Sequence, residues 1–232
     1  MNRAIIFDVD GTLAETEETH RRAFNRAFRA AGLTWSWNQG LYRQLLAVTG
    51  GKERIRYFVE DFGAEGAPTE NLDGFIQELH AAKTVAYTQM VKGGELDLRP
   101  GVRAVIDEAR QQGYRLAIAT TTTPANIDAL LAASFGDAGH SLFEVICAGD
   151  SVPNKKPAPD VYLRTLEELD LPAGSCVALE DSRNGLLSAR AAGIETIVTP
   201  SIYTRDENFA EAALVIDDLE SLDLAVIEEL LH

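Results

Sequence analysis

The sequence is poor in cysteine and in basic residues. Its 232 residues include only two cysteines, Cys147 and Cys176, and both lie in apolar stretches. We therefore expect two small core residues rather than a disulfide, a metal centre or a nucleophile. The 21 Lys and Arg residues are outnumbered by 36 Asp and Glu, which gives a formal net charge of -15. This charge disfavours nucleic acid and anionic membranes as partners.

The sequence also has no apolar run of membrane-spanning length, and its first residues lead straight into strand-like sequence without a signal-peptide pattern. A soluble, cytoplasmic protein is expected. Hydrophobic residues make up 46% and charged residues 25%, so the chain can bury a sizeable core, as one large domain or as one domain with a smaller insert. The overall charge would repel an anionic substrate, which would therefore need a metal ion or a few placed cations.

Short apolar runs alternate with helical patterns along most of the chain. This alternation predicts an α/β fold in which helices cover a parallel sheet. The expected strands are residues 4–7, 115–119, 143–148, 176–180, 195–199 and 213–216. The expected helices, with apolar positions three and four apart, are residues 102–113, 125–136, 160–170 and 185–193.

One long interval, between the first two expected strands, contains helices only. Its first helix has an apolar face formed by His20, Ala23, Phe24, Ala27 and Phe28. A long helix over residues 69–90 should direct five side chains inward, namely Leu72, Phe75, Ile76, Leu79 and Val85. We therefore expect a helical insert, residues 16–94, on a core formed by residues 1–15 and 95–232, with hinges near 14–16 and 93–98.

Polar side chains gather at four of the expected strand ends. They are Asp8, Asp10 and Thr12 after the first, Thr120 to Thr123 after the second, Asp150, Lys155 and Lys156 after the third, and Glu180, Asp181 and Ser182 after the fourth. Ligands of open parallel sheets bind beyond the carboxyl ends of the strands, so we expect these side chains at one edge. Four carboxylates at one edge cannot all stay ionised unless a cation balances their negative charge. Because their oxygen atoms are the ligands that Mg²⁺ prefers, we expect a magnesium site there. A lysine and a hydroxyl would complete a phosphate site.

Four segments resemble, in order and spacing, the motifs of the haloacid dehalogenase superfamily of phosphotransferases. They are DVDGT at 8–12, a hydroxyl after the second strand, a lysine before PAPD, and LEDS at 179–182. The resemblance implies a Rossmann-like core with an inserted small helical cap. DVDGTLAETEETHRRAF, TGGKERI, ATTTT, KKPAPDVY, ALEDSRNG and YTR further resemble the CbbY-like sugar-phosphate phosphatases, a group that includes phosphatases of xylulose-1,5-bisphosphate.

The resemblance implies a role for each motif residue. Asp8 would be a nucleophile that forms an aspartyl-phosphate, and Asp10 would protonate the leaving oxygen and then activate water. Thr120 and Lys156 would bind the transferring phosphoryl group, and Lys156 would also keep Asp8 ionised. Mg²⁺ would neutralise charge on that group, and its implied ligands are Asp8, Asp10 (through the backbone carbonyl), Glu180 and Asp181.

Further residues are candidates for the substrate side of the site. His20 is either a packed core residue or a substrate-side partner of Asp10. The TGGKERI segment is either a glycine turn before a solvated helix end or a specificity loop, in which Lys52 or Arg54 would hold the uncleaved phosphate of a bisphosphate. The other candidates are Glu15, Gly50, Gly51, Thr121 and Thr122, whereas Arg99, Arg205 and Lys155 are expected at the surface.

The sequence leaves three alternatives to a phosphatase open. Dehalogenases use a single nucleophilic aspartate, so the presence of Asp10 favours phosphoryl chemistry. The related β-phosphoglucomutases commonly carry an aliphatic residue where this chain has Thr12, which favours a phosphatase over a mutase. A non-catalytic binding protein is disfavoured because the nucleophile and metal-ligand positions are all filled. The expected substrate is a five- or six-carbon sugar phosphate, with xylulose-1,5-bisphosphate first from the resemblance, and the expected state is a monomer.

Overall fold

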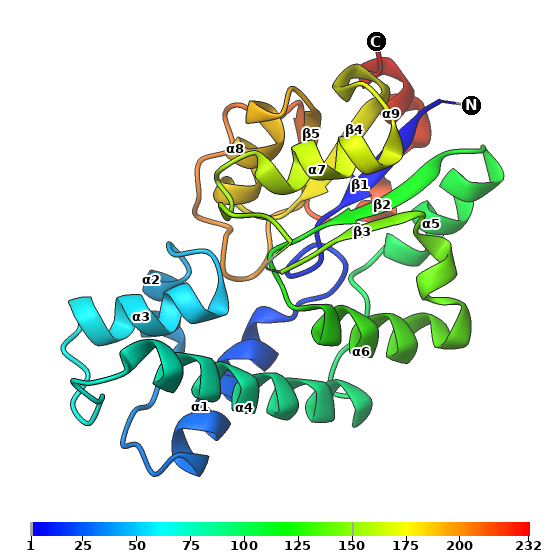
Figure 1. The fold of residues 1–232 in the computed structure, drawn as a ribbon. Coiled ribbons are helices and arrows are strands. Elements are labelled where there is room, and N and C mark those ends of the chain that lie inside the picture. Colours follow the sequence, from blue (N-terminus) through cyan, green and yellow to red (C-terminus); the bar gives the residue numbers. More distant parts are fainter. Residues whose placement is uncertain (1, 150) are drawn as a thin grey trace.

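A six-stranded parallel sheet forms the centre of the computed structural model, which describes residues 2–149 and 151–232 (Figure 1). The strand order is β3-β2-β1-β4-β5-β6, and Phe7 of β1 lies beside Ile118 of β2 and Leu179 of β4. The strands are β1 (Ala4–Phe7), β2 (Arg115–Ala119), β3 (Val145–Cys147), β4 (Cys176–Glu180), β5 (Glu195–Val198) and β6 (Leu214–Val215). The predicted α/β class is confirmed, and Asp150 lies outside the described residues.

Helices cover both faces of this sheet, because side chains alternate along β1. Ile5 and Phe7 belong to a core with helices on one face, and Ala4 and Ile6 belong to a second core on the other. The first face carries α5 (Val102–Gln111), α6 (Pro124–Phe135) and α9 (Leu224–Leu230), and the second carries α7 (Asp160–Leu169) and α8 (Arg183–Ala191). Short 3₁₀ turns are η1 (Gly136–Ala138), η2 (His140–Leu142), η3 (Ala173–Ser175) and η4 (Leu219–Ser221).

Four helices between β1 and α5 form a separate group beyond one end of the sheet (Figure 1). They are α1 (Glu17–Ala30), α2 (Gln39–Leu45), α3 (Gly51–Asp61) and α4 (Leu72–Lys92). Their shared core is aromatic, with Phe24, Phe28, Trp35, Trp37, Tyr42 and Phe58 packed together. The apolar face predicted for α1 is buried in full. The prediction for Val85 is wrong, since this side chain is 57% exposed on α4.

The two chain crossings between this helical group and the sheet lie side by side. Ala14 forms an antiparallel bridge with Leu98, and the backbone N–H of Arg99 donates to the carbonyl of Leu13 at 2.9 Å. Arg99 is not the surface residue expected from the sequence, because its side chain is only 8% exposed. Its guanidinium donates to four backbone carbonyls, those of Gly11, Thr199, Pro200 and Asp217. This arginine therefore ties together the loops around both crossings.

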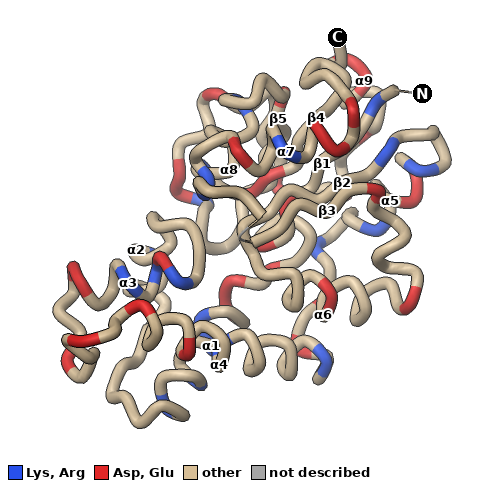
Figure 2. Tube along the Cα trace, viewed as in Figure 1, with Lys and Arg blue, Asp and Glu red and all other residues tan. Residues whose placement is uncertain are grey.

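Acidic and basic positions are interspersed along both the sheet-containing part and the helical group (Figure 2). One segment of the sheet-containing part also enters the aromatic core of the helical group. Tyr203, in the loop after β5, packs against Tyr42, with ring centroids 5.6 Å apart, and donates to Glu18 at 2.6 Å. None of the helices in the described part of the chain combines the length and apolar character needed to cross a membrane.

Candidate active site

The first site element is the tight turn that follows β1. The backbone N–H of Asp8 donates to the carbonyl of Leu179 at 3.0 Å, which continues the pairing of β1 with β4. Gly11 then takes a positive φ of 85°, and a Cβ placed on it would lie 2.1 Å from Oδ2 of Asp181. Only glycine fits there. The turn after β1 and the end of β4 therefore approach each other closely enough to bring their carboxylates together.

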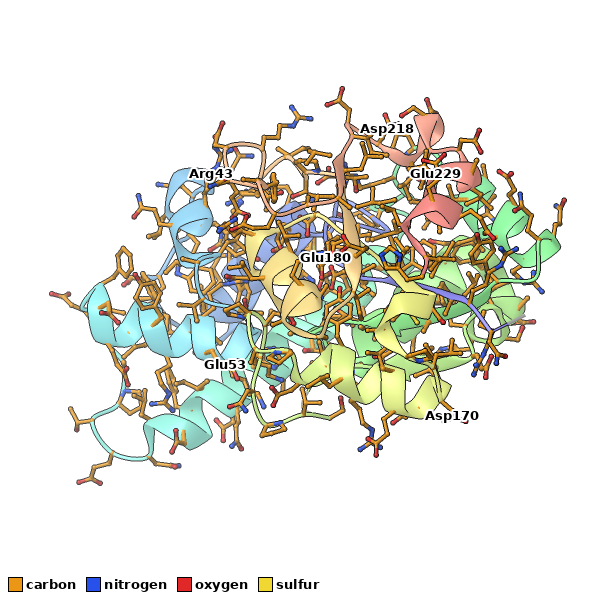
Figure 3. All side chains as sticks on the ribbon, turned by 90° about the horizontal axis from the view of Figure 1, so that it is seen from above. Arg43, Glu53, Asp170, Glu180, Asp218 and Glu229 are labelled. Atoms are coloured by element: carbon orange, nitrogen blue, oxygen red, sulfur yellow. The ribbon has the colours of Figure 1, made fainter. Side chains whose placement is uncertain are left out.

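Three of the four predicted acids form a buried cluster at this point. Oxygen atoms of Asp8, Glu180 and Asp181 all lie within 4.8 Å of one another, and Glu180, labelled near the centre of the view in Figure 3, is fully buried. Burial is the main reason why the pKa of Asp8 rises to about 8, and burial together with the charges of Asp8 and Glu180 raises the pKa of Asp181 well above its usual value. These shifts favour the protonated forms of both carboxyl groups unless a further cation balances their charge.

Lys156 supplies one positive charge to the cluster. Its Nζ lies 2.7 Å from Oδ1 of Asp8, 2.6 Å from Oε1 of Glu180 and 2.9 Å from the carbonyl of Ala119. Burial alone would lower the pKa of Lys156, but the two carboxylates outweigh it and raise this pKa overall. The lysine is therefore protonated. It contacts Oδ1 of Asp8 and not Oδ2.

The cluster also fits a second, harder cation. Oε1 of Glu180 already accepts from Lys156 and from the hydroxyl of Tyr162, whereas its Oε2 is buried without a hydrogen-bond partner among the described residues. A Cβ on Gly185 would lie 1.8 Å from this Oε2, so the first turn of α8 leaves room only for the carboxylate. Clustered carboxylate oxygens and an unpaired buried oxygen are the donor set that Mg²⁺ prefers.

The side chain of Asp10 is directed away from the other three acids, toward the helical group. Its Oδ1 accepts from the hydroxyl of Thr16 at 2.6 Å and lies 2.9 Å from Nε2 of His20. Burial by itself would raise the pKa of Asp10, but the interactions with His20 and Thr16 and the charge of Lys83 outweigh it, and this pKa is lowered. Only the backbone of Asp10 is consistent with the predicted contribution to a metal site.

His20 combines the two interpretations that the sequence leaves open. Its ring is buried and stacks on that of Tyr87, with centroids 4.1 Å apart, while its Nε2 contacts Asp10. Burial and the neighbouring charge of Lys83 lower the pKa of His20. The imidazole is therefore neutral near pH 7, and it donates its Nε2 proton to the Asp10 carboxylate.

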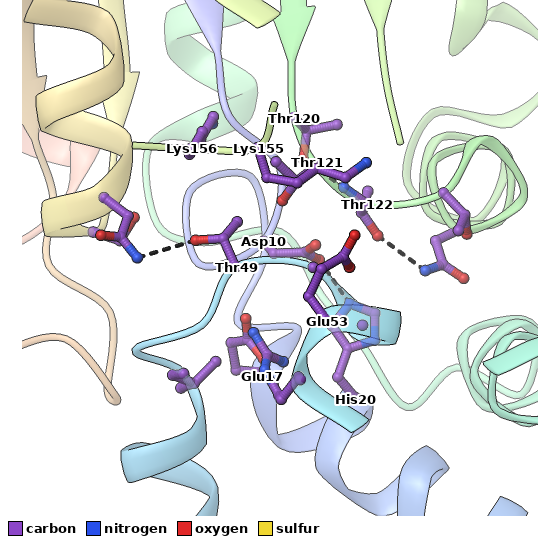
Figure 4. Close-up of a pocket in the computed structure, with 18 of the residues that line it drawn as sticks. Asp10, Glu17, His20, Thr49, Glu53, Thr120, Thr121, Thr122, Lys155 and Lys156 are labelled. Atoms are coloured by element: carbon purple, nitrogen blue, oxygen red, sulfur yellow. Dashed lines mark hydrogen bonds and ion pairs between the residues drawn. The ribbon is translucent and has the colours of Figure 1, made fainter. Parts of the chain in front are cut away.

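The pocket in front of Asp8 has one wall from the sheet side and one from the helical group (Figure 4). The sheet side presents the threonines after β2 together with Lys155 and Lys156, and the helical group presents Glu17, His20 and Glu53 opposite them. The predicted site residues that line this pocket are Asp8, Asp10, His20, Gly50, Gly51, Lys52, Arg54, Thr120, Thr121, Thr122, Lys156 and Asp181.

Two residues near the pocket depart from the sequence expectation. Glu15 does not line this pocket, because its carboxylate lies 3.5 Å from Nε of Arg99 and accepts from the backbone of Ile202. Lys155 is half-buried rather than solvated, lines the pocket and donates to the carbonyl of Gly149. Glu180, which was predicted only as a metal ligand, is fully buried and does not line the pocket itself.

On the helical side, Arg54 is already held in a network. Its guanidinium donates to the hydroxyl of Tyr42 at 2.8 Å, and that hydroxyl donates to Glu17 at 2.6 Å. Burial opposes the positive charge of Arg54, but Tyr42, Glu17 and Asp10 raise its pKa overall. The predicted loop arginine is therefore a buried, oriented cation and not part of a solvated helix end.

Sequence reasoning gave no role to several residues that line the pocket, among them Glu17, Lys83, Asn126 and Asn184. Lys83 is only 4% exposed, and its Nζ lies 5.0 Å from the ring centre of Phe24 and 5.3 Å from that of Tyr87. A signal for it was available, because Lys83 follows Leu79 by four residues and precedes Tyr87 by four, on the buried face of α4. A charged residue on such a face indicates a site.

Comparison with known proteins agrees with this geometry. The chain matches the family described as haloacid dehalogenase-like hydrolase over residues 2–193. It is 54% identical to protein CbbY of Rhodobacter capsulatus over 228 residues, which is 98% of both chains.

Solved structures give the same result. The crystal structure of CbbY from Rhodobacter sphaeroides in complex with phosphate superimposes with a TM-score of 0.93 at 49% identity, covering 98% of this chain and 100% of that one. A mutant of that protein in complex with xylulose-(1,5)bisphosphate gives a TM-score of 0.91 at 49% identity and covers 97% and 99%. β-Phosphoglucomutase from Clostridium difficile, at 19% identity and a TM-score of 0.79 over 99% and 97%, shares the fold. The chain belongs to the haloacid dehalogenase-like hydrolase family.

Proposed function

We propose that this hydrolase cleaves the phosphate ester of a small phosphorylated sugar through an aspartyl-phosphate on Asp8. One observation carries the proposal: a buried carboxylate, Asp8, faces a polar pocket while Lys156 holds one of its oxygens at 2.7 Å. Relatives support the ligand class, since a CbbY crystal structure contains xylulose-(1,5)bisphosphate and a relative at 30% identity from Thermotoga maritima is called a phosphorylated carbohydrates phosphatase.

In the first step, Oδ2 of Asp8 attacks phosphorus, and the bond from phosphorus to the sugar oxygen breaks. The electron pair of that bond stays on the sugar oxygen, which takes from Asp10 the proton that Asp10 gained from water in the second step of the preceding cycle. Lys156 favours the ionised nucleophile, and the hydroxyl of Thr120 donates to a phosphoryl oxygen. In the second step, Asp10 accepts a proton from water, which attacks phosphorus and releases phosphate and Asp8.

Thr16 and His20 orient the carboxylate of Asp10 for both proton transfers. Their hydrogen bonds, at 2.6 and 2.9 Å, engage the same oxygen, Oδ1, so Oδ2 remains to exchange the proton. Both residues belong to the segment after the first crossing. We therefore propose that residues 16–94 act as a cap on the core of residues 1–15 and 95–232, and that closing the cap brings the acid–base group into register with the nucleophile.

We further propose that Mg²⁺ is the cofactor. Asp8, Glu180, Asp181 and the backbone carbonyl of Asp10 would hold it, as the unpaired Oε2 of Glu180 and the clustered carboxylates indicate. When bound, the ion would neutralise negative charge on the transferring phosphoryl group.

The finer proposal is a sugar bisphosphate, with xylulose-1,5-bisphosphate first. Arg54, Lys52 and Lys83 lie on the wall contributed by the helical group, where they would meet the phosphate that is not cleaved. Burial of Arg54 and Lys83 strengthens their attraction for a dianion, because little water screens them. A monophosphate would have no second phosphate group to contact this wall of the pocket.

The test is phosphate release from 4-nitrophenyl phosphate with and without Mg²⁺, followed by a panel of sugar mono- and bisphosphates. We expect Mg²⁺-dependent release that Asp8→Asn abolishes. A wild-type rate no higher than that of Asp8→Asn would refute the phosphatase. Interconversion of sugar phosphates that requires a bisphosphate activator would instead indicate a mutase. Lys52→Ala should reduce the preference for bisphosphates, and an unchanged preference would exclude Lys52 from that contact.

A further inference from the structure

We propose that Asn126 is a positioning residue that fixes the hydroxyl of Thr122 as a hydrogen-bond donor to a phosphate oxygen in the pocket. The inference rests on the proposed function and extends it to a residue outside the four motifs. Asn126 is the third residue of α6, is only 2% exposed, and reaches the pocket wall just behind the threonines that follow β2.

The hydrogen bond between the two side chains has a defined direction. Nδ2 of Asn126 donates to Oγ1 of Thr122 at 2.9 Å, while Oδ1 of Asn126 is buried without a partner among the described residues (Figure 4). The reverse orientation would leave a buried NH₂ group with two unpaired protons. A buried donor without a partner is rarer in proteins than an unpaired carbonyl oxygen, so the observed direction is the favourable one.

The direction decides which way the threonine proton can point. A hydroxyl has one proton, and Oγ1 of Thr122 already accepts from the amide, so its O–H is available for another acceptor. The same holds for Thr120, whose Oγ1 accepts the backbone N–H of Thr122 at 3.3 Å. Both threonines line the pocket, on the same side as Lys155 and Lys156. Thr122, held by the Asn126 amide, and Thr120, held by a backbone N–H, thus each have a hydroxyl proton available to an anion in the pocket.

Replacing Asn126 by aspartate tests this direction, because the shape is kept and the donor is lost. A carboxylate can only accept, so Thr122 would turn its proton toward it and away from phosphate. We expect the inhibition constant of inorganic phosphate and the KM for 4-nitrophenyl phosphate to rise about tenfold or more, the size of one charge-assisted hydrogen bond. The control is Asn25→Asp, which alters a buried amide that is hydrogen-bonded to the backbone of Trp37 within the helical group. It should lower the melting temperature without changing either constant.

A double-mutant cycle separates positioning from general disruption. Thr122→Val and Asn126→Ala should each weaken phosphate inhibition, and in the Thr122→Val background Asn126→Ala should add less than twofold. Independent, multiplying effects would overturn the inference, as would an unchanged inhibition constant in Asn126→Asp. If the wild type neither hydrolyses the aryl phosphate nor binds inorganic phosphate, the proposed function falls as well. If it does both and the cycle is multiplicative, only the role of Asn126 falls.

Discussion

The side-chain amide of Asn184 donates to Oγ1 of Thr49 at 3.0 Å and so joins the two walls of the pocket (Figure 4). Asn184 lies in the first turn of α8, three residues after Asp181 of the acid cluster. Thr49 precedes Gly50, the N-cap of α3, and Gly51, its first residue. The same amide also donates to the carbonyl of Ala47 at 3.4 Å. Asn184 therefore connects the first turn of α8 with the loop of residues 46–50, which leads into the helix that carries Lys52 and Arg54.

Removing this connection should affect large substrates more than small ones. In Asn184→Ala, we expect the KM for a sugar bisphosphate to rise by about fivefold, because one hydrogen bond of about 1 kcal/mol no longer favours the closed loop. The kcat/KM for 4-nitrophenyl phosphate should stay within about twofold, since this compound does not span both walls. Steady-state kinetics with the two substrates provides the comparison.

Arg43→Ala is the matched control for that variant. Arg43 also joins the two parts of the chain, through Asp206 at 3.0 Å, but this ion pair is exposed and remote from the pocket. Exposed pairs contribute about 0 to 1 kcal/mol, so both substrates should be nearly unaffected. Equal losses for both substrates in Asn184→Ala would contradict a role confined to the loop.

The second prediction concerns the charge of Lys83. Burial lowers the pKa of Lys83 to about 8, although the facing carboxylates of Asp10 and Glu17 oppose this, and Arg54 lowers it further. The side chain therefore loses its proton as pH rises through about 8, and the KM for a sugar bisphosphate should increase above that pH. Lys83→Arg keeps its charge, so its KM should stay flat from pH 7 to about 9.5.

The titration of Lys83 should weaken substrate binding at high pH but increase the free energy of unfolding there. In the unfolded chain, Lys83 keeps its proton up to the ordinary pKa of 10.5. Between about pH 8 and pH 10.5 the unfolded state therefore binds more protons than the folded state, and raising the pH favours the folded state. Replacing Lys92, an exposed lysine at the end of α4, by arginine serves as the control for both measurements. If Lys83→Arg repeats the wild-type rise in KM, a group other than Lys83 is titrating.

The third prediction concerns Gly185. In Gly185→Ala, the new methyl group would overlap Oε2 of Glu180, and the carboxylate would have to move. We expect the Mg²⁺ concentration needed for half-maximal activity to rise at least tenfold, because a displaced ligand typically costs that much in metal affinity. Gly40→Ala, in helix α2, meets its nearest atom at 3.5 Å and should leave the requirement unchanged. A normal Mg²⁺ titration in Gly185→Ala would argue against Glu180 as a ligand.

The fourth prediction tests Arg99 as a structural residue. Arg99→Met removes a buried guanidinium from four backbone carbonyls, and we expect a loss of about 3 kcal/mol in the free energy of unfolding. For a chain of this length, that corresponds to a fall of about 10 °C in the melting temperature. Arg205→Met, which changes an exposed arginine nearby, should shift it by less than 2 °C. Similar shifts in the two variants would show that the buried network contributes little.

Much of the fold followed from local patterns. Apolar runs and polar strand ends located all six strands to within about two residues, because a buried parallel strand needs continuous hydrophobic sequence. The two edge strands, β3 (Val145–Cys147) and β6 (Leu214–Val215), are shorter than predicted, since each pairs on one side only. Val85 was misplaced for a different reason: with lysine and tyrosine on the buried face of α4, apolar character alone pointed to the wrong side of the helix.

By itself, the sequence determined the fold class and the family, and it identified four acids at strand ends, three of which form the buried cluster, because strand ends and their motif spacing are local features. Only the tertiary structure decided which of these side chains contact one another and which other residues join the site. In the folded chain, Asp10 contacts Thr16 and His20, and Arg99 is buried and donates to four backbone carbonyls. Lys83 and Asn126, which lie on helices, line the pocket. These outcomes depend on distances between segments far apart in the chain, and burial at those meeting points sets which groups carry charge.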